Sequence, residues 1–391
     1  MIWITMRPED FADDAPGEIE TVDGIFAFNP DPLPPEIEAS HDLLAENGRA
    51  MYSVGQLSDL ETWLDSPEVI LSPLVHREAV DSSNIETITR LTLSDIYRRE
   101  AGEEPGRTAT ERADITEARN YVTAINAGIE ALREGAKLDR DLLCRLHEIL
   151  LQGVRGEQQN PGEFRGELVG IGEPGTPVGE ARFVPTPPAS IPYALRGLLH
   201  YIRSGPTYAP LVELALIHYQ FETIHPFQDG NGRLGRLLVM LVLYEWDLLP
   251  GPYLYPSSYF NANRDVYLDG LFAVSRDGDW SEWISFFVQA IAEQGREAYT
   301  VSRELLALRD QYREQYQDEG AVVRELIDFV IEHPYLTEPQ AVEALARSQP
   351  AVNQAIRKLW DDDVLRETTG QQRNRRFEAT SILEIVEPYD L

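Results

Sequence analysis

Apolar residues recur at three- and four-residue spacing over most of the chain, which is the pattern of amphipathic helices. This spacing breaks between residues 156 and 190, where glycine and proline surround two short extended segments, ELVGI and ARFVP. The break predicts a β-hairpin set into an otherwise helical protein. The predicted helices fall within 55–100, 108–152, 190–204, 210–224, 231–248 and 258–298.

The two ends of the chain differ from this helical middle. Residues 1–45 are acidic and interrupted by proline, so we expect an extended or loosely packed lead-in. Residues 320–391 carry three short helical patterns followed by a strand, a turn and a strand. This order indicates a winged helix-turn-helix. No apolar run reaches 18 residues, so we expect neither a transmembrane helix nor a membrane partner.

Composition narrows the setting of the protein. The 391 residues suggest two or three domains. Acidic residues number 66 against 34 basic ones, and the resulting net charge of −32 repels nucleic acid at long range. The single cysteine, Cys144, cannot form an internal disulfide, and the N-terminus has no basic or apolar leader. We therefore expect a cytoplasmic protein.

One polar, glycine-rich segment, HPFQDGNGRLGR at 225–236, lies between two strongly apolar segments. Its Gly-Asn-Gly at 230–232 directly precedes a predicted helix, so the backbone N–H groups of both would converge on one anion. Arg233 and Arg236, one turn apart on one helical face, would add bidentate donors. This number of donors suits a polyphosphate better than a single anion.

Two side chains beside the predicted anion site would carry chemistry. Asp229 offers a hard oxygen ligand to a Mg²⁺ ion that bridges two phosphates. His225 is the residue type whose ordinary pKa best suits proton abstraction near neutral pH. A lone histidine before a proline is more often a loop residue, and a lone GNG is usually a turn. The prediction of a nucleotide site therefore depends on the combination.

The segment resembles the motif HxFx(D/E)GNGRxxR of the Fic proteins. NPGEFR from 160, ARFVP from 181 and GDWSEW from 278 are also similar to Fic sequences. The resemblance implies a mainly α-helical Fic core with a small β-hairpin flap. It covers about residues 60–300. Together with the pattern of the C-terminal residues, it predicts an N-terminal region at 1–105, a Fic domain at 106–300 and a winged helix-turn-helix domain at 320–391. The matching residues are His225, Phe227, Asp229, Gly230, Asn231, Gly232, Arg233 and Arg236.

The resemblance also implies a reaction, the transfer of AMP from ATP to a Tyr, Thr or Ser hydroxyl of a target protein or of the chain itself. His225 would take the hydroxyl proton and Asp229 would hold Mg²⁺. Asn231 would stabilise the α-phosphate with the GNG backbone, while Arg233 and Arg236 would hold the β- and γ-phosphates. Relatives that use UMP or phosphocholine keep the transferred group open. The expected ATP-binding residues are Gly230, Asn231, Gly232, Arg233, Leu234, Gly235 and Arg236.

A second segment, DSSNIETI, resembles the inhibitory helix motif (S/T)xxxE(G/N) of the same family. Ser82 and Glu86 take its key positions, one turn apart on one helical face, although such patterns also cap helices. Thr87 departs from the usual Gly or Asn. The resemblance implies an inhibitory helix near 76–90 in which Glu86 pairs with Arg236 and keeps ATP from binding productively. In some relatives this glutamate instead aligns a water that removes AMP, so de-AMPylation is the alternative direction.

The predicted winged helix keeps a second class of function open. A local basic face would allow DNA binding, although many such units contact proteins or form homodimers. The first hypothesis is an autoinhibited AMP transferase whose C-terminal unit recruits a target or a dimer partner. The second is a DNA-binding regulator that senses nucleotide, but an intact base and metal ligand favour the first. The basic face would comprise Asn353, Gln354, Arg357, Lys358, Arg366, Arg373, Arg375 and Arg376.

Overall fold

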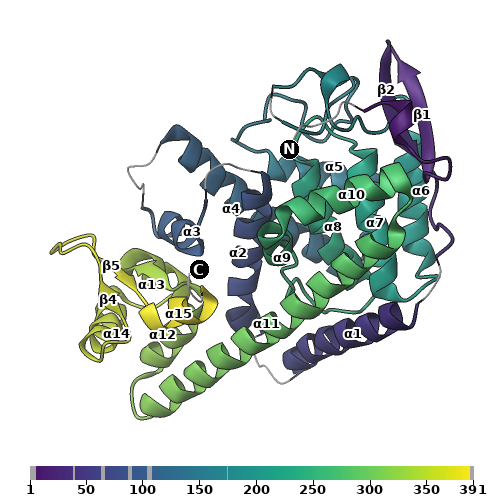
Figure 1. Ribbon diagram of the computed structural model, residues 1–391. Helices are drawn as coiled ribbons and strands as arrows, with labels where there is room; N and C mark the ends of the chain where they lie inside the picture. Colours follow the sequence, from purple (N-terminus) through teal and green to yellow (C-terminus); the bar gives the residue numbers. More distant parts are fainter. Residues whose placement is uncertain are drawn as a thin grey trace.

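The chain is mainly helical, as the apolar spacing predicts. The computed structural model describes residues 6–37, 40–62, 67–86, 90–103, 108–173 and 175–387, so Thr87 lies outside the described residues. Within them the helices up to the glycine-rich segment and just beyond it are α1 (His41–Thr62), α2 (Pro67–Glu86), α3 (Leu93–Glu100), α4 (Ala109–Arg133), α5 (Arg140–Leu150), α6 (Ile191–Ser204), α7 (Pro210–Ile224) and α8 (Asn231–Glu245). They are followed by α9 (Ser257–Ala262), α10 (Arg264–Asp277), α11 (Trp280–Gln315), α12 (Ala321–Glu332), α13 (Glu338–Leu345), α14 (Gln349–Asp361) and α15 (Thr380–Val386). Figure 1 shows α7 and α8 enclosed by the other helices of the larger lobe.

Helices α7 and α8 form the centre of the core because they are apolar nearly all round. Nearly every residue of both helices is buried, and α8 also packs on α4, α5 and α2. The two helices pack on each other, and the segment between them lies at the point where one ends and the other begins. A rigid pair of buried helices thus presents the polar segment predicted to carry the chemistry.

The N-terminal lead-in, expected to be extended or loosely packed, contains extended strands that pair as a β-hairpin, and this pairing was not predicted. β1 (Gly17–Val22) pairs antiparallel with β2 (Ile25–Pro30) through a two-residue turn. Asp23 and Gly24 have φ of 51° and 83°, as a type I′ hairpin turn requires. The Asp-Gly pair between EIETV and IFAFN was the available signal. The acidic, proline-containing composition of the segment does not by itself indicate this turn.

The hairpin predicted around ELVGI and ARFVP is reduced to a single antiparallel bridge. Ile171 and Phe183 exchange backbone hydrogen bonds of 2.8 and 3.2 Å, and a 3₁₀ turn at Val178–Glu180 lies between them. The N-terminal hairpin supports this flap from behind, because Phe28 packs on Phe183 and its N–H donates to Val184 at 2.9 Å. Two segments far apart in sequence therefore make one small apolar cluster.

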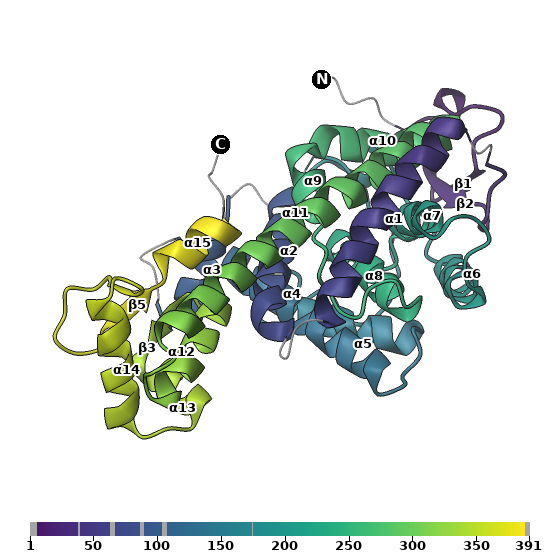
Figure 2. The same ribbon diagram turned by 90° about the horizontal axis from the view of Figure 1, so that it is seen from below.

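A single long helix, α11, connects the core to the C-terminal unit. Figure 2 shows it running from beside α10 to α12, with α1 along its side. At Gly295 a Cβ would lie 2.9 Å from the Ser53 Cβ, so the missing side chain lets α1 approach closely. The helix extends to Gln315, well past the predicted limit of 298. Charged residues recur along α11. None of the helices in the described ranges is both long and apolar enough to cross a membrane.

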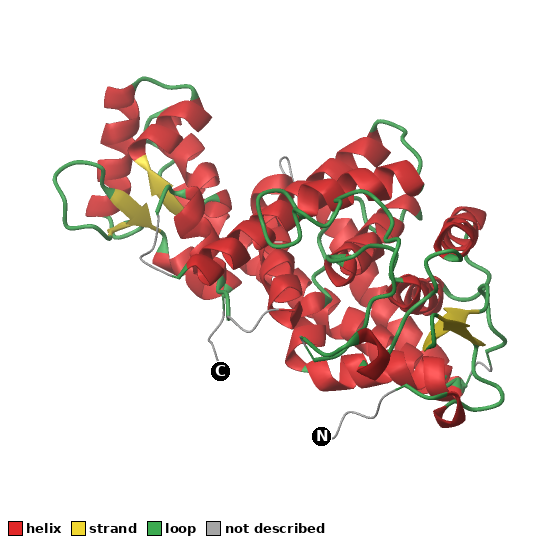
Figure 3. Cartoon of the chain, turned by 90° about the horizontal axis from the view of Figure 1, so that it is seen from above, coloured by secondary structure: helices red, strands yellow, loops and turns green. Residues whose placement is uncertain are grey.

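The C-terminal unit contains the predicted three helices, α12 to α14, and a small sheet. β3 (Tyr335–Thr337), β5 (Arg376–Glu378) and β4 (Arg366–Glu367) form an antiparallel sheet in the order β3-β5-β4. β3 was not predicted. Figure 3 shows this sheet and the N-terminal hairpin at opposite ends of the molecule. Helix α12 packs directly on α2. That this unit is a winged helix-turn-helix, and that the domains end at the predicted residues, stay predictions.

Candidate functional site

The glycine-rich segment turns sharply because two of its residues take left-handed backbone conformations. His225, the first residue after α7, has φ 48° and ψ 61°, and its N–H donates to the Phe221 carbonyl at 2.9 Å. Gly230 has φ 75° and precedes α8. A left-handed conformation costs about 1–2 kcal/mol for a residue with a side chain, so the His225 backbone needs support from its surroundings.

Arg165, the last residue of NPGEFR, supplies part of that support. Its buried guanidinium donates to the carbonyls of His225 at 2.8 Å, Glu167 at 2.9 Å and Thr186 at 2.5 Å. Burial lowers the pKa of Arg165 to about 10, which still leaves it charged at neutral pH. In the sequence, Arg165 stands out only as the last residue of NPGEFR, a segment similar to Fic sequences. Its contact with the His225 carbonyl, 60 residues away, could not be predicted from a local pattern.

The rest of the segment is fastened by Asn231 and His147. The Asn231 amide accepts from the N–H of Phe227 and donates to its carbonyl, both at 2.8 Å. His147 stacks on the Phe227 ring at 3.8 Å, donates from Nε2 to the Asp229 carbonyl at 2.8 Å and accepts at Nδ1 from Gly162 at 2.9 Å. Burial lowers the pKa of His147 to about 4, so it stays neutral and keeps this tautomer.

Two of the residues expected to bind ATP make contacts within the chain. The Asn231 side chain is hydrogen-bonded to the Phe227 backbone, and its own N–H lies at the start of α8, where backbone donors are free. Leu234 is fully buried, and its N–H donates to the Gly230 carbonyl. Leu234 therefore belongs to the packing of α8.

A cavity of about 650 Å³ opens at the N-terminus of α8. It is bounded by the end of α2, the flap, the glycine-rich segment and α10. Tyr267 of α10 also lines this cavity, whereas the nearby Tyr259 and Asn263 do not. Arg233, Leu234, Gly235 and Ser82 are not among the residues that line it. The predicted site residues that line it are Glu86, His225, Asp229, Gly230, Asn231, Gly232 and Arg236.

His225 enters this cavity as a neutral imidazole. Its Nδ1 lies 3.2 Å from the Glu222 carbonyl, so Nδ1 carries the proton and Nε2 keeps a free lone pair. Burial, assisted by the positive charge of Arg165, lowers the pKa of His225 to about 4. At neutral pH the ring is therefore in the form that accepts a proton.

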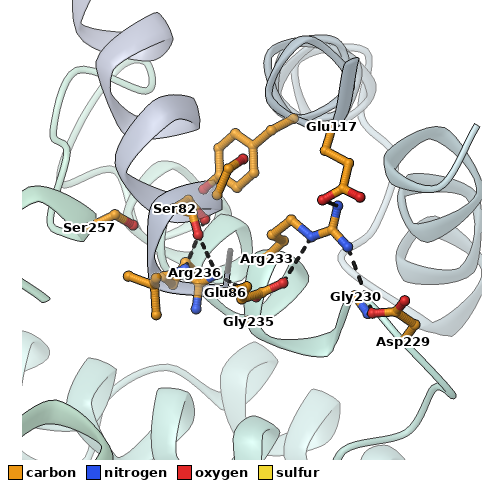
Figure 4. Close-up of polar contacts among 12 residues, drawn as sticks. Ser82, Glu86, Glu117, Asp229, Gly230, Arg233, Gly235, Arg236 and Ser257 are labelled. Atoms are coloured by element: carbon orange, nitrogen blue, oxygen red, sulfur yellow. Dashed lines mark hydrogen bonds and ion pairs between the residues drawn. The ribbon is translucent and has the colours of Figure 1, made fainter. Parts of the chain in front are cut away.

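The two arginines of the motif are held by the end of α2. Arg236 donates to the Ser82 hydroxyl at 2.8 Å, to the Ser82 carbonyl at 2.9 Å and to Glu86 Oε1 at 2.6 Å. Glu86 Oε2 accepts from Arg233 Nε at 3.1 Å, so one carboxylate bridges both guanidinium groups (Figure 4). The Glu86–Arg236 pair expected from the resemblance is present, and the contact with Arg233 is additional.

The bridging carboxylate is ionised. Burial alone would raise the pKa of Glu86, but the attraction of Arg236 and Arg233 outweighs burial and lowers the pKa. Glycine at 232 makes the approach feasible, because a Cβ there would collide with Glu86 Oε1. The glycine therefore serves the glutamate as well as any anion bound at the helix N-terminus.

Two more carboxylates near the motif were not expected from the sequence. Glu117 on α4 lies 3.0 Å from Arg233 Nη1, and both side chains are about 1% exposed. Glu222 lines the cavity, and burial raises its pKa to about 7. A Cβ on Gly235 would collide with Glu222 Oε1, so Gly235 makes room for this side chain, and Gly235 does not line the cavity.

Helix α2 is anchored to the core by buried polar contacts. Glu78 accepts from the Ser257 N–H at 3.0 Å and from the Tyr121 hydroxyl at 3.0 Å. Asp81 accepts from the Ser258 hydroxyl and from the Asn261 amide. Arg264 Nε donates to the Ile85 carbonyl at 2.7 Å, which satisfies a free acceptor at the end of α2.

Asp229 is the predicted metal ligand and lies at the rim of the cavity. Its side chain is 30% exposed, and Oδ1 accepts from the Gly230 N–H at 2.7 Å. In the part of the chain that the structure describes, no group of three or more His, Cys, Asp or Glu side chains could hold a metal. Mg²⁺ commonly needs only one or two carboxylates when substrate phosphates and waters complete its shell, so a single Asp229 fits a substrate-bound ion.

Comparison with known proteins agrees with this geometry. The Fic/DOC family N-terminal model matches residues 44–130, and the Fic/DOC family model matches residues 137–243. Among solved structures, a Fic family protein from Desulfovibrio desulfuricans G20 covers 89% of this chain and 98% of its own, with a TM-score of 0.56 and 21% identity. That likeness supports the fold.

Two curated relatives are similar over shorter stretches. A probable protein adenylyltransferase of Aquifex aeolicus (strain VF5) is 36% identical over 86 residues, 22% of this chain and 27% of the relative. Protein adenylyltransferase fic-1 of Caenorhabditis elegans is 24% identical over 141 residues, 36% of this chain and 25% of the relative. The chain thus matches about a quarter of the length of each. With its motif, its fold and both matched regions in agreement, the chain belongs to the Fic family.

Proposed function

We propose that this Fic family chain is a protein adenylyltransferase, which moves AMP from ATP to a Tyr, Thr or Ser hydroxyl of a target protein or of itself. The observation that carries the proposal is one cavity that combines a neutral His225, the N-terminus of α8 and the guanidinium of Arg236. A helix N-terminus with arginines suits a polyphosphate. The names of the two curated relatives support the same activity.

In the proposed reaction the target hydroxyl gives its proton to Nε2 of His225 as its oxygen attacks the α-phosphorus of ATP. A new oxygen–phosphorus bond forms, the bond to the bridging oxygen of the β-phosphate breaks, and pyrophosphate leaves. The free N–H groups at the start of α8 would face the developing charge, while Arg233 and Arg236 would hold the outer phosphates. The enzyme contributes position and charge, and it forms no covalent intermediate.

Asp229 would hold the Mg²⁺ that accompanies ATP. The ion would neutralise charge on the departing pyrophosphate, which is the chemistry a hard divalent cation supplies in phosphoryl transfer. The contact of Asp229 Oδ1 with the Gly230 N–H fixes its carboxylate beside the proposed phosphate site.

The activity would be restrained by Glu86. Its ionised carboxylate occupies donors of both Arg233 and Arg236, which the outer phosphates would need. Because like charges repel, an ATP bound beside it would have to take a different position from the reactive one. Withdrawal of the α2 end would free both arginines at once.

The C-terminal unit is better suited to protein contacts than to DNA. Several of its basic or polar side chains already meet carboxylates within the chain, which reduces the positive potential that DNA binding requires. These contacts are Arg366 with Glu378, Lys358 with Asp362, Arg376 with Glu103 and Asn353 with Glu338. A target protein or a second copy of the chain is therefore the partner we favour for this unit.

The test is the intact mass of the Glu86→Gly variant after incubation with ATP and Mg²⁺. A gain of one AMP per modified hydroxyl is expected, and the Glu86→Gly/His225→Ala variant should gain none. An unchanged mass, with no labelled AMP passed to proteins of a cell lysate, would remove the proposal. Loss of AMP from a pre-modified protein would instead support de-AMPylation.

A further inference from the structure

Arg233 is surrounded by three carboxylates that come from three different elements. Glu86 of α2 meets Nε at 3.1 Å, Glu117 of α4 meets Nη1 at 3.0 Å, and Asp229 lies 3.8 Å from Nη2. Figure 4 shows Glu117 approaching the guanidinium from the side away from Arg236. The three contacts divide the guanidinium, so that each carboxylate faces a different nitrogen.

Glu117 differs from the other two carboxylates in its burial. It is 1% exposed and sits on α4, which packs against α8 in the core, whereas the Glu86 and Asp229 side chains are 25% and 30% exposed. Its nearest other cation among the described residues is Arg155, at 3.7 Å from Oε1. Neither Glu117 oxygen has a hydrogen bond to any described group.

A buried carboxylate with so few partners is costly. Taking two charges out of water costs more than a single ion pair returns in many proteins, so the pair gives little net stability. Consistent with that cost, burial raises the pKa of Glu117 even though Arg233 and Arg155 attract it. Stability alone therefore gives a weak reason for a glutamate at this position.

We infer that Glu117 is a positioning residue, which holds Nη1 of Arg233 from the core so that Nε and Nη2 stay directed toward the outer phosphates of ATP. The inference rests on the proposed nucleotide site. Because Glu86 and Glu117 meet different nitrogens, a phosphate oxygen can replace Glu86 without any movement of Arg233. Glu86 then determines how often the site is open, and Glu117 determines how tightly the open site binds ATP.

The experiment compares ATP and AMP binding by isothermal titration calorimetry in the Glu86→Gly variant. Adding Glu117→Ala removes the anchor, and we expect ATP affinity to fall about tenfold, the scale of one interaction with a charged group. Adding Glu117→Gln keeps an acceptor oxygen and should lower ATP affinity about threefold. AMP lacks the outer phosphates, so its affinity should stay the same in both variants.

The matched control is Glu130→Ala, which removes an exposed glutamate from the same helix and should leave both affinities unchanged. An unchanged ATP affinity in Glu117→Ala, or an equal loss for ATP and AMP, would overturn the inference. If Glu117→Ala does not fold, as judged by its melting curve, Glu117→Gln decides by the same comparison. A Glu86→Gly protein that binds ATP but transfers no AMP would end the proposed function alone, whereas one that binds no ATP would end both.

Discussion

The glycine-rich segment and the end of α2 are both held by buried hydrogen bonds, but their partners differ in kind. The segment is fastened by intrachain contacts of Arg165, His147 and the Asn231 amide. The end of α2 is fastened largely by Arg233 and Arg236, the groups that would bind ATP. The proposed catalytic side of the site is thus built in advance. The Glu86 carboxylate, in contrast, is held by donors that a phosphate could also use, while the rest of α2 is anchored separately by Glu78, Asp81 and Arg264.

The largest effect should come from Arg165→Ala. It leaves carbonyls of His225, Glu167 and Thr186 without their donor and lets the histidine shift, and a misplacement of about 1 Å can cost about a hundredfold in rate. AMP incorporation by the Glu86→Gly variant measures the loss. The control is Arg145→Ala, an exposed position of α5. Equal rates in the two variants would show that the segment does not need this support.

Glu86→Gly should act in the opposite direction. Removing the carboxylate frees both arginines, and the gain in AMP incorporation should lie in the range of about 5- to 150-fold that couplings between sites usually show. Labelled ATP at a concentration below KM measures it. No gain would mean that the α2 end does not restrain the enzyme.

The pH profile tests whether His225 works as a neutral base. An ordinary histidine of pKa 6.5 would be only about one-quarter neutral at pH 6, whereas a pKa of about 4 keeps it neutral there. In the Glu86→Gly variant, protonation of His225 should therefore lower kcat/KM little between pH 8 and 6. The fall due to His225 should come only below pH 6.

Glu222 must be separated from this effect because its pKa of about 7 lies within the same range. The profile is measured again in the Glu86→Gly/Glu222→Gln variant. An acid limb with its midpoint near pH 6.5 in that variant would contradict the depressed pKa of His225.

The smallest effect should come from Ser82→Ala. It removes the hydroxyl that accepts from Arg236 Nε but leaves the Ser82 carbonyl and Glu86 in place. One hydrogen bond of ordinary net strength corresponds to a gain in activity of about threefold. A gain as large as that of Glu86→Gly would mean that the hydroxyl, and not the carboxylate, is the main restraint.

The sequence predicted what a local pattern can express. The helices on either side of the motif were predicted from that pattern, whereas the Glu86–Arg236 pair was expected only from the resemblance to Fic proteins. A motif does not distinguish backbone from side-chain use, so it could not predict that the Asn231 amide bonds Phe227 or that Leu234 packs in the core.

Contacts between distant segments had no such pattern. Glu117 lies on a helix more than a hundred residues from Arg233, and one glutamate on an amphipathic helix looks like any other. His147 likewise lies in a helix whose spacing predicts only packing. The β1–β2 hairpin differs, since its Asp-Gly turn is a local signal, although the acidic, proline-containing composition around it favours an extended or loosely packed segment.

The bridging of Arg233 and Arg236 by one glutamate has an evolutionary consequence. Each group that receives Glu86, including the bare backbone at Gly232, is also a group that the proposed ATP site needs. Mutations of Arg233, Arg236 or Gly232 would therefore damage the proposed catalysis as well as the proposed inhibition. Selection for catalysis alone would remove such mutations. If Glu86 restrains the enzyme as proposed, the restraint could be lost by change in α2, whereas selection for catalysis would preserve the groups that hold Glu86.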